Sequence, residues 1–184
     1  MKSALLVIDV QNIYTNPSSE LYVQGSKKIV SNINSLISGY AKAKLPIILI
    51  RHTHRPDGTD AGRMWDFNGT PEAIGFLEGS LDVEFDKSLL IPKERVMLLK
   101  HRYSAFIGTD LDNLLKKMQV GRVVIAGFMA NFCCDSSARD AHDMDYFVDY
   151  IADATGCPDL EKHSQSQIKA VIEETLATGI ACVQ

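Results

Sequence analysis

Short apolar runs alternate with amphipathic stretches along most of the chain. Six of these runs have the length and the content of β-branched residues that strands have. They are Leu5–Val10, Ile47–Ile50, Val96–Leu99, Val123–Ala126, Phe147–Ile151 and a weaker one at Ile180–Val183. Their apolar residues are continuous rather than alternating, which is typical of strands that are covered on both faces. The pattern therefore predicts six strands in a mainly parallel sheet.

Between these runs, apolar residues recur every three or four positions, which indicates helices with one buried face. The helical stretches are Ser26–Lys44, Gly108–Met118 and Ser164–Ala177. Alternation of strands and helices is the signature of an α/β fold, and its crossovers should be right-handed. We therefore predict one domain over residues 1–184, in which helices flank a six-stranded sheet in a three-layer, Rossmann-like α/β/α arrangement.

One segment breaks the alternation. Residues His52–Lys87 contain the turn signals Pro56-Asp57-Gly58 and Asn68-Gly69-Thr70-Pro71. A loop of this length in a compact domain is uncommon and usually has a function. Within it, Pro71–Leu77 is expected to form a short helical piece.

Composition and charge narrow the class of protein. Of the 184 residues, 46% are hydrophobic and 23% charged, and the formal net charge of −4 argues against a surface that coats nucleic acid. The apolar runs are too short for a membrane span, and the N-terminal run resembles a strand rather than a signal peptide. The four cysteines form no C-x-x-C pair. Composition therefore indicates a soluble, cytoplasmic domain that binds neither nucleic acid nor membrane, and it indicates no function.

Three reactive residues lie at or just past the ends of different predicted strands. Asp9 ends the first run, Lys100 follows Val96–Leu99, and Cys133 lies six residues beyond Gly127. Ligands of parallel sheets bind beyond the carboxyl ends of the strands, so these three side chains could converge there. Each also has a structural alternative: Asp9 as a helix cap or turn former, and Lys100 as a strand-end lysine that reaches solvent.

The segment Gly127–Ala141 is expected to run from strand into helix, with Asn131 as the N-cap. A cysteine in the first helical turn lies in the positive field of the helix dipole, which lowers the pKa of its thiol. The alternative for Cys133 is the role of a small buried hydrophobe. That role is expected for the other three cysteines, Cys134, Cys157 and Cys182.

Three motifs occur in order along the chain. They are Asp9-Val10-Gln11-Asn12, Lys100-His101-Arg102-Tyr103-Ser104-Ala105-Phe106, and Ala130-Asn131-Phe132-Cys133 followed by Ser137-Ala138-Arg139-Asp140-Ala141. Together they resemble the isochorismatase-like cysteine hydrolases, a superfamily that includes nicotinamidases, N-carbamoylsarcosine amidohydrolases and isochorismatases. The resemblance spans nearly the whole chain, because Gly108-Thr109-Asp110-Leu111 and Asp153-Ala154 also fall in order.

The resemblance implies a catalytic triad of Asp9, Lys100 and Cys133. Cys133 would attack a carbonyl carbon as a thiolate, Asp9 would carry the proton, and Lys100 would stabilise both charged forms. It also implies an oxyanion hole made by the N–H groups of Met129 and Cys133, beside a cis peptide at Phe128–Met129.

A cysteine, where isochorismatases usually have glycine, favours hydrolysis of a C–N bond in a small amide or carbamoyl substrate through a thioester. Two alternatives remain open: a vinyl-ether hydrolase of the isochorismatase type, and a non-catalytic binding module. The resemblance also implies a homodimer or homotetramer.

Nicotinamidases of this superfamily typically hold a metal with an Asp-x-His pair and a later histidine. Here His52 and His54 would point to the same side of an extended segment, but the aspartate is missing, with Asp57 and Asp60 as the available substitutes. We therefore predict no metal and no other cofactor, and histidines that form hydrogen bonds in a substrate loop. The remaining histidines carry no spacing signal: His101, His142 and His163.

Several further residues are expected to line the substrate pocket. They are Gln11, Tyr14, Trp65, Tyr103 and Phe106. Gln11 would orient the substrate or a loop, or simply cap the strand end. Packing is the alternative role for the four aromatic residues.

Overall fold

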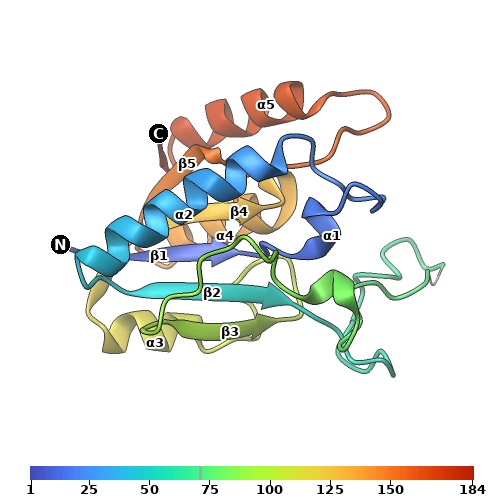
Figure 1. Ribbon diagram of the computed structural model, residues 1–184, viewed down its shortest axis with the longest axis horizontal. Coiled ribbons are helices and arrows are strands. Elements are labelled where there is room, and N and C mark those ends of the chain that lie inside the picture. Colours follow the sequence, from blue (N-terminus) through green and yellow to red (C-terminus); the bar gives the residue numbers. More distant parts are fainter. Residues whose placement is uncertain (71) are drawn as a thin grey trace.

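The computed structural model describes residues 1–70 and 72–184, and its centre is a six-stranded sheet (Figure 1). The strands are β1 (Lys2–Ile8), β2 (Ile47–His52), β3 (Val96–Lys100), β4 (Val120–Phe128), β5 (Phe147–Gly156) and β6 (Cys182–Val183). Their order is β3-β2-β1-β4-β5-β6, and each of the five pairings is parallel. The predicted sheet is confirmed.

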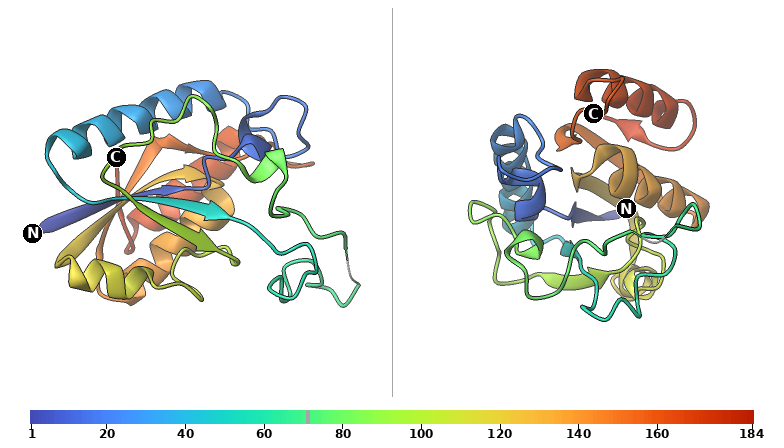
Figure 2. Two further views of the ribbon diagram at one scale, coloured as in Figure 1. Left: turned by 60° about the horizontal axis from the view of Figure 1, so that its bottom comes forward. Right: turned by 90° about the vertical axis from the view of Figure 1, so that its right-hand side faces the viewer.

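Helices cover both faces of this sheet, as predicted (Figure 2). The helical elements are α1 (Asn12–Thr15), α2 (Ser26–Lys42), the 3₁₀ turn η1 (Leu81–Val83), α3 (Leu111–Lys117), the π turn η2 (Ala130–Cys134), α4 (Asp135–Asp143) and α5 (Gln165–Ala177). In the left view of Figure 2, α2 lies on one side of the sheet and α3 on the other. None of the described helices is both long and apolar enough to cross a membrane.

Two hydrophobic clusters, one on each face, hold the layers together. The helical spacing of Ile29, Ile33 and Ile37 buries one side of α2 against the first face of the sheet. Leu111 and Leu115 of α3 pack with the apolar residues of the opposite face. The apolar positions of the sequence therefore lie where the predicted elements place them.

The chain changes direction through the sheet at β1, which lies between β2 and β4. At the end of β4, Gly127 has φ +133°, and a Cβ on it would lie 1.9 Å from the carbonyl oxygen of Ile8. Only glycine allows the two strands to approach so closely here. This switch point is the place where parallel sheets usually bind ligands.

The expected helix over 71–77 is wrong for residues 72–77, and Pro71 lies outside the described residues. The His54 N–H donates to the Phe76 carbonyl at 2.8 Å, and the Glu78 N–H donates to the His54 carbonyl at 2.8 Å. These bonds join the segment to the end of β2 through a parallel bridge between His54 and Leu77, with Phe76 at φ 56°. The nearest helical turn is instead η1, at Leu81–Val83.

The expectation that Asn131 caps a helix is also wrong. Asn131 lies inside the π turn η2, where the Cys134 N–H donates to the Met129 carbonyl at 3.1 Å, and α4 begins only at Asp135.

Another correction concerns Cys182, which is exposed rather than buried. It belongs to a strand of two residues at the edge of the sheet, where little covers it.

Candidate active site

Asp9, Lys100 and Cys133 meet at the carboxyl end of the sheet, on three separate elements. Asp9 directly follows β1 with φ 51°, and its N–H donates to the Ile50 carbonyl of β2 at 2.9 Å. Lys100 ends β3, and Cys133 lies in η2 after β4. Aspartate is among the few residues that accept a left-handed conformation readily, so it suits this turn.

The Lys100 ammonium lies between the carboxylate and the thiol. Its Nζ is 2.8 Å from Asp9 Oδ2 and 3.2 Å from Cys133 Sγ, and it donates to the Arg102 carbonyl at 3.0 Å. Asp9 and Lys100 are fully buried, and Cys133 is 2% exposed. A buried ion pair is tolerable only when its hydrogen-bonding capacity is used, and here the ammonium donates to Arg102 and Cys133 besides forming the ion pair with Asp9.

Burial has the largest effect on the pKa values of Asp9 and Cys133. It raises the pKa of Asp9 against the opposing effect of Lys100. It also raises the pKa of Cys133 to about 12, although the Lys100 charge lowers it. The expected lowering of the Cys133 pKa is therefore wrong: loss of solvation outweighs both the nearby cation and the helix start. The resting sulfur is a thiol beside a carboxylate.

The Asp9 carboxylate retains capacity to accept a proton. Its Oδ2 is close to Lys100 Nζ, but among the described residues neither carboxylate oxygen receives a hydrogen bond of good geometry. Buried carboxylates normally have such partners. One of these carboxylate oxygens lies within 4.8 Å of Cys133 Sγ.

The backbone around η2 forms the turn that carries the two expected oxyanion donors, the N–H groups of Met129 and Cys133. The peptide bond between Phe128 and Met129 is cis. The Met129 carbonyl accepts the N–H groups of Phe132 and Cys134, at 3.2 and 3.1 Å, and these bonds form the turn that carries Cys133. The N–H groups of Met129 and Cys133 lie at the start of this turn and within it.

Gln11 bonds a loop, in keeping with one of the three roles considered for it. Its side-chain amide donates to the carbonyls of His52, at 2.9 Å, and Val83, at 2.8 Å, and its oxygen accepts the His52 N–H at 3.0 Å. The residue is fully buried. Gln11 thus joins the end of β2 to η1.

The four aromatic pocket candidates lie in three different environments. Tyr14 is buried, with ring centroids 6.0 Å from Phe76 and 5.7 Å from Phe128, and Trp65 lies 6.1 Å from Phe76. Phe106 lies in the core cluster of the other face, in contact with Tyr146. Tyr103 is 39% exposed, and its ring packs on Phe132, one residue before Cys133. Tyr103 therefore contacts the residue that precedes the thiol.

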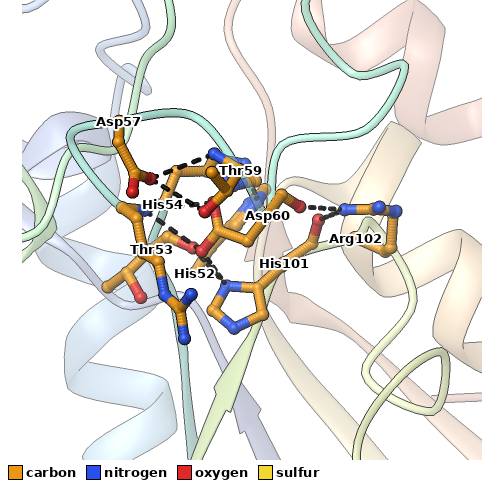
Figure 3. Close-up of polar contacts among 9 residues, drawn as sticks. His52, Thr53, His54, Asp57, Thr59, Asp60, His101 and Arg102 are labelled. Atoms are coloured by element: carbon orange, nitrogen blue, oxygen red, sulfur yellow. Dashed lines mark hydrogen bonds and ion pairs between the residues drawn. The ribbon is translucent and has the colours of Figure 1, made fainter.

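A second polar cluster adjoins the triad (Figure 3). His52 and His54 face each other with 3.1 Å between their Nε2 atoms, and His54 Nδ1 lies 3.3 Å from Asp60 Oδ1. His101 joins them, with its Nδ1 3.3 Å from Asp60 Oδ2. The spacing of the histidines along the sequence did not predict that His101 belongs to this cluster. The pairing of β2 with β3 could have predicted it, because that pairing sets Lys100 beside His52 and so places His101 near Thr53.

Donor atoms of His54, Asp60 and His101 all lie within 4.8 Å of one another, the spacing that a metal ion needs. Their hydrogen bonds do not suit one. His101 Nδ1 is 2.6 Å from the Thr53 carbonyl, an acceptor, so this nitrogen carries a proton. His54 Nδ1 faces a carboxylate in the same way. A protonated ring nitrogen has no lone pair for a metal, so in this arrangement neither Nδ1 atom could be a metal ligand.

Burial also affects the charge of the paired imidazoles. It lowers the pKa of His52 well below its ordinary value, and the Lys100 charge lowers it further. Burial likewise lowers the pKa of His54, although Asp60 opposes the shift. Both rings are therefore neutral at physiological pH.

Comparison with known proteins agrees with the fold and the motifs. The family model described as "Isochorismatase domain" matches residues 3–177. A protein of Arabidopsis thaliana named Nicotinamidase 3 is 32% identical over 162 residues, which cover 88% of this chain and 76% of that protein. A second protein of the same plant, described as a probable inactive nicotinamidase, is 31% identical over 165 residues, or 88% of this chain and 84% of that protein.

Among solved structures, a cysteine hydrolase from Pseudomonas syringae superposes with a TM-score of 0.88. The two sequences are 29% identical, and the match covers 99% of this chain and 87% of the other. The similarity therefore extends over the whole sheet and its flanking helices.

Proposed function

Because the chain belongs to the isochorismatase family of hydrolases, we propose that it is a cysteine amidohydrolase. It would cleave the C–N bond of a small amide or carbamoyl substrate through a thioester. One observation carries this proposal: the Lys100 ammonium lies 2.8 Å from the Asp9 carboxylate and 3.2 Å from the Cys133 thiol. An acid–base group and a nucleophile held by one cation are the parts that acyl transfer requires.

In the first half-reaction, Asp9 accepts the proton of the Cys133 thiol, and the sulfur attacks the carbonyl carbon. A thiol whose pKa is raised to about 12 depends on such a base, because little thiolate forms without it. The C–N bond then breaks, and Asp9 gives the proton to the departing amine or ammonia. The backbone N–H groups of Met129 and Cys133 would stabilise the oxyanion that forms between these steps.

In the second half-reaction, water adds to the thioester carbonyl while Asp9 accepts one of its protons. The C–S bond breaks, the sulfur regains the proton from Asp9, and the carboxylic acid leaves. Lys100 remains charged throughout and stabilises each anionic form in turn, since an opposite charge this close favours ionised groups. The cycle returns both Asp9 and Cys133 to their starting protonation.

Ammonia release from a panel of primary amides and N-carbamoyl amines tests the proposal, with nicotinamide first because of the relative named Nicotinamidase 3. Rapid quenching during turnover followed by mass spectrometry should find the acyl group on the peptide that contains Cys133. Cys133→Ala should lower kcat by at least about a thousandfold. Cys182→Ser, at an exposed thiol, is the matched control and should retain full activity.

A specific observation also supports the vinyl-ether alternative: a carboxyl group whose pKa is raised by burial, like that of Asp9, can act as an acid. An ether hydrolase would keep its activity in Cys133→Ala and lose it in Asp9→Asn. A protein that turns over no substrate and forms no Cys133 adduct would be a binding module, and the amidohydrolase proposal would then be wrong.

A further inference from the structure

His52 is a buried, uncharged residue that the proposed chemistry does not use. It is 1% exposed, and its ring stacks on Phe76 with centroids 4.6 Å apart and planes inclined by 15°. One of its ring nitrogens lies within 4.8 Å of both an Asp9 carboxylate oxygen and Cys133 Sγ. His52 therefore borders the place where a scissile bond would lie.

The hydrogen bonds beside His52 assign its tautomer. An ionised Asp60 can only accept, so His54 Nδ1 donates to it and His54 Nε2 is left with a bare lone pair. His52 Nε2, 3.1 Å from that atom, must then carry the proton between them. Because the His52 ring is neutral, its Nδ1 has no proton and is an acceptor.

That acceptor has no partner among the described residues, and it is buried. Buried acceptors are rarely left unpaired, so an unpaired one on a ring that borders Asp9 and Cys133 indicates a donor that arrives with a ligand. The backbone N–H of Arg55 donates to both carboxylate oxygens of Asp60, each at 3.1 Å. These contacts hold Asp60 in place at the other end of the series of hydrogen bonds that includes His54 and His52. The acceptor is thus fixed before any ligand binds.

We propose that His52 Nδ1 accepts a hydrogen bond from an N–H group of the scissile amide or carbamoyl nitrogen, and that His54 and Asp60 are positioning residues that hold His52 in this tautomer. The inference rests on the proposed function, since it names the substrate atom read by that same site. It also gives the histidine pair a role that needs no metal. When His52 holds the N–H of the scissile nitrogen, the lone pair that forms on this nitrogen as the C–N bond breaks would point toward the proton on Asp9.

The tautomer can be measured without any substrate. Protein labelled with ¹⁵N-histidine is studied by long-range ¹H–¹⁵N correlation, in which bare and protonated ring nitrogens have well-separated shifts. We expect a bare Nδ1 and a protonated Nε2 for His52, and the reverse for His54. In His54→Phe, which removes the acceptor of the Nε2 proton, the His52 pattern should become a mixture. A protonated Nδ1 on His52 in the parent protein would overturn the proposal.

The substrate contact is tested with the primary amide hydrolysed fastest and the methyl ester of the same acid, which lacks the N–H. His52→Phe keeps the stacking on Phe76 but has no acceptor, and its ratio of amide to ester kcat/KM should fall about tenfold. His52→Asn, with an oxygen near the position of Nδ1, should keep the ratio within about threefold of the parent. The exposed His142→Phe is the matched control. An equal loss for amide and ester in His52→Phe would refute the contact.

A metal at this cluster is the competing explanation. Stoichiometric zinc in the purified protein, or a zinc titration that moves the His54 and His101 ring shifts together, would contradict the proposal. If the parent releases no ammonia from any amide, the proposed function fails, whereas the ring-nitrogen shifts still show whether His52 has the proposed tautomer. The two failures are therefore distinguishable.

Discussion

Lys100 controls the ionisation of the thiol beside it. Its charge lowers the pKa of Cys133, so Lys100→Met should raise that pKa further above about 12. Alkylation of Cys133 by iodoacetamide should then be at least about tenfold slower than in the parent at the same pH. The rate in the parent should itself climb as pH rises from about 7 to about 9, because only the thiolate reacts.

Peptide mass spectrometry measures this alkylation site by site. Exposed Cys182 reports the reactivity of the reagent in the same sample, and its rate should not change in Lys100→Met. Faster alkylation of Cys133 in the variant would show that Lys100 does not favour the thiolate.

Gln11 contributes to stability through three buried hydrogen bonds. Gln11→Met keeps the length of the side chain but leaves two carbonyls and an N–H without partners, so we expect the free energy of unfolding to fall by about 3 kcal/mol or more. Urea denaturation measures the loss. Asn12→Ala is the matched control: Asn12 also bonds η1, through Leu81, but at an exposed position, and its loss should stay below about 1 kcal/mol. Equal losses would mean that burial does not set the cost.

At the level of single residues, the sequence predicts positions that depend on one strand and misses those that depend on two. Asp9, Lys100 and Cys133 follow apolar runs, so their place at the sheet edge could be foreseen. His101 could not, because its partners depend on the register of β2 against β3. The raised pKa of Cys133 was missed for a similar reason, since burial depends on all the layers around it.

At the level of elements, the junction of β1 and β4 depends on one glycine. Gly127→Ala would place a Cβ 1.9 Å from the Ile8 carbonyl oxygen at φ +133°, so the strands must separate beside Asp9. We expect the free energy of unfolding to fall by about 3 kcal/mol or more, or the cooperative transition to be lost, in urea denaturation followed by circular dichroism.

Gly39→Ala is the matched control, because Gly39 lies in the exposed face of α2 with open space around it. Alanine there should stabilise the protein by about 0.5–1 kcal/mol. A Gly127→Ala variant as stable as the parent would show that the close approach of the two strands is not required.

The elements predicted best from the sequence are those whose buried side follows from their own apolar spacing. The three predicted helices and five of the predicted strands match the structure, because this spacing alone decides which side faces the sheet. α2 ends at Lys42 rather than Lys44, where φ of +54° leaves the helix. The helix expected at 71–77 is absent from residues 72–77 because the backbone there bonds to His54, more than twenty residues earlier. Local helix propensity carries no information about so distant a partner.

At the level of the whole molecule, the long loop between β2 and β3 extends past the carboxyl ends of the strands, where the buried triad residues lie (Figure 2). Arg102 holds this loop: its guanidinium donates to the Asp60 carbonyl at 2.7 Å, and Gly62 packs so closely that a Cβ would lie 2.4 Å from Nη2.

Removing the contact should open the loop without unfolding the protein. In Arg102→Met we expect trypsin to cleave after Arg63, whose side chain is 82% exposed, about tenfold faster, because a hydrogen bond from a charged donor is lost. Arg122→Met is the matched control, since Arg122 pairs with Asp149 on the sheet far from the loop. Unchanged cleavage after Arg63 in Arg102→Met would mean that other contacts hold the loop.

The Lys100 ammonium is buried among three partners, and this affects how the protein can be attached to a support. Reagents that couple to amines need a free, accessible nitrogen, and the Lys100 amine is neither. Lys42 and Lys44 are exposed at the end of α2, beside the start of β2 and so at the edge of the sheet opposite the triad. Amine coupling through such lysines should therefore attach the protein to a solid support with Lys100 unmodified and with the carboxyl end of the sheet, where Cys133 lies, directed away from the support.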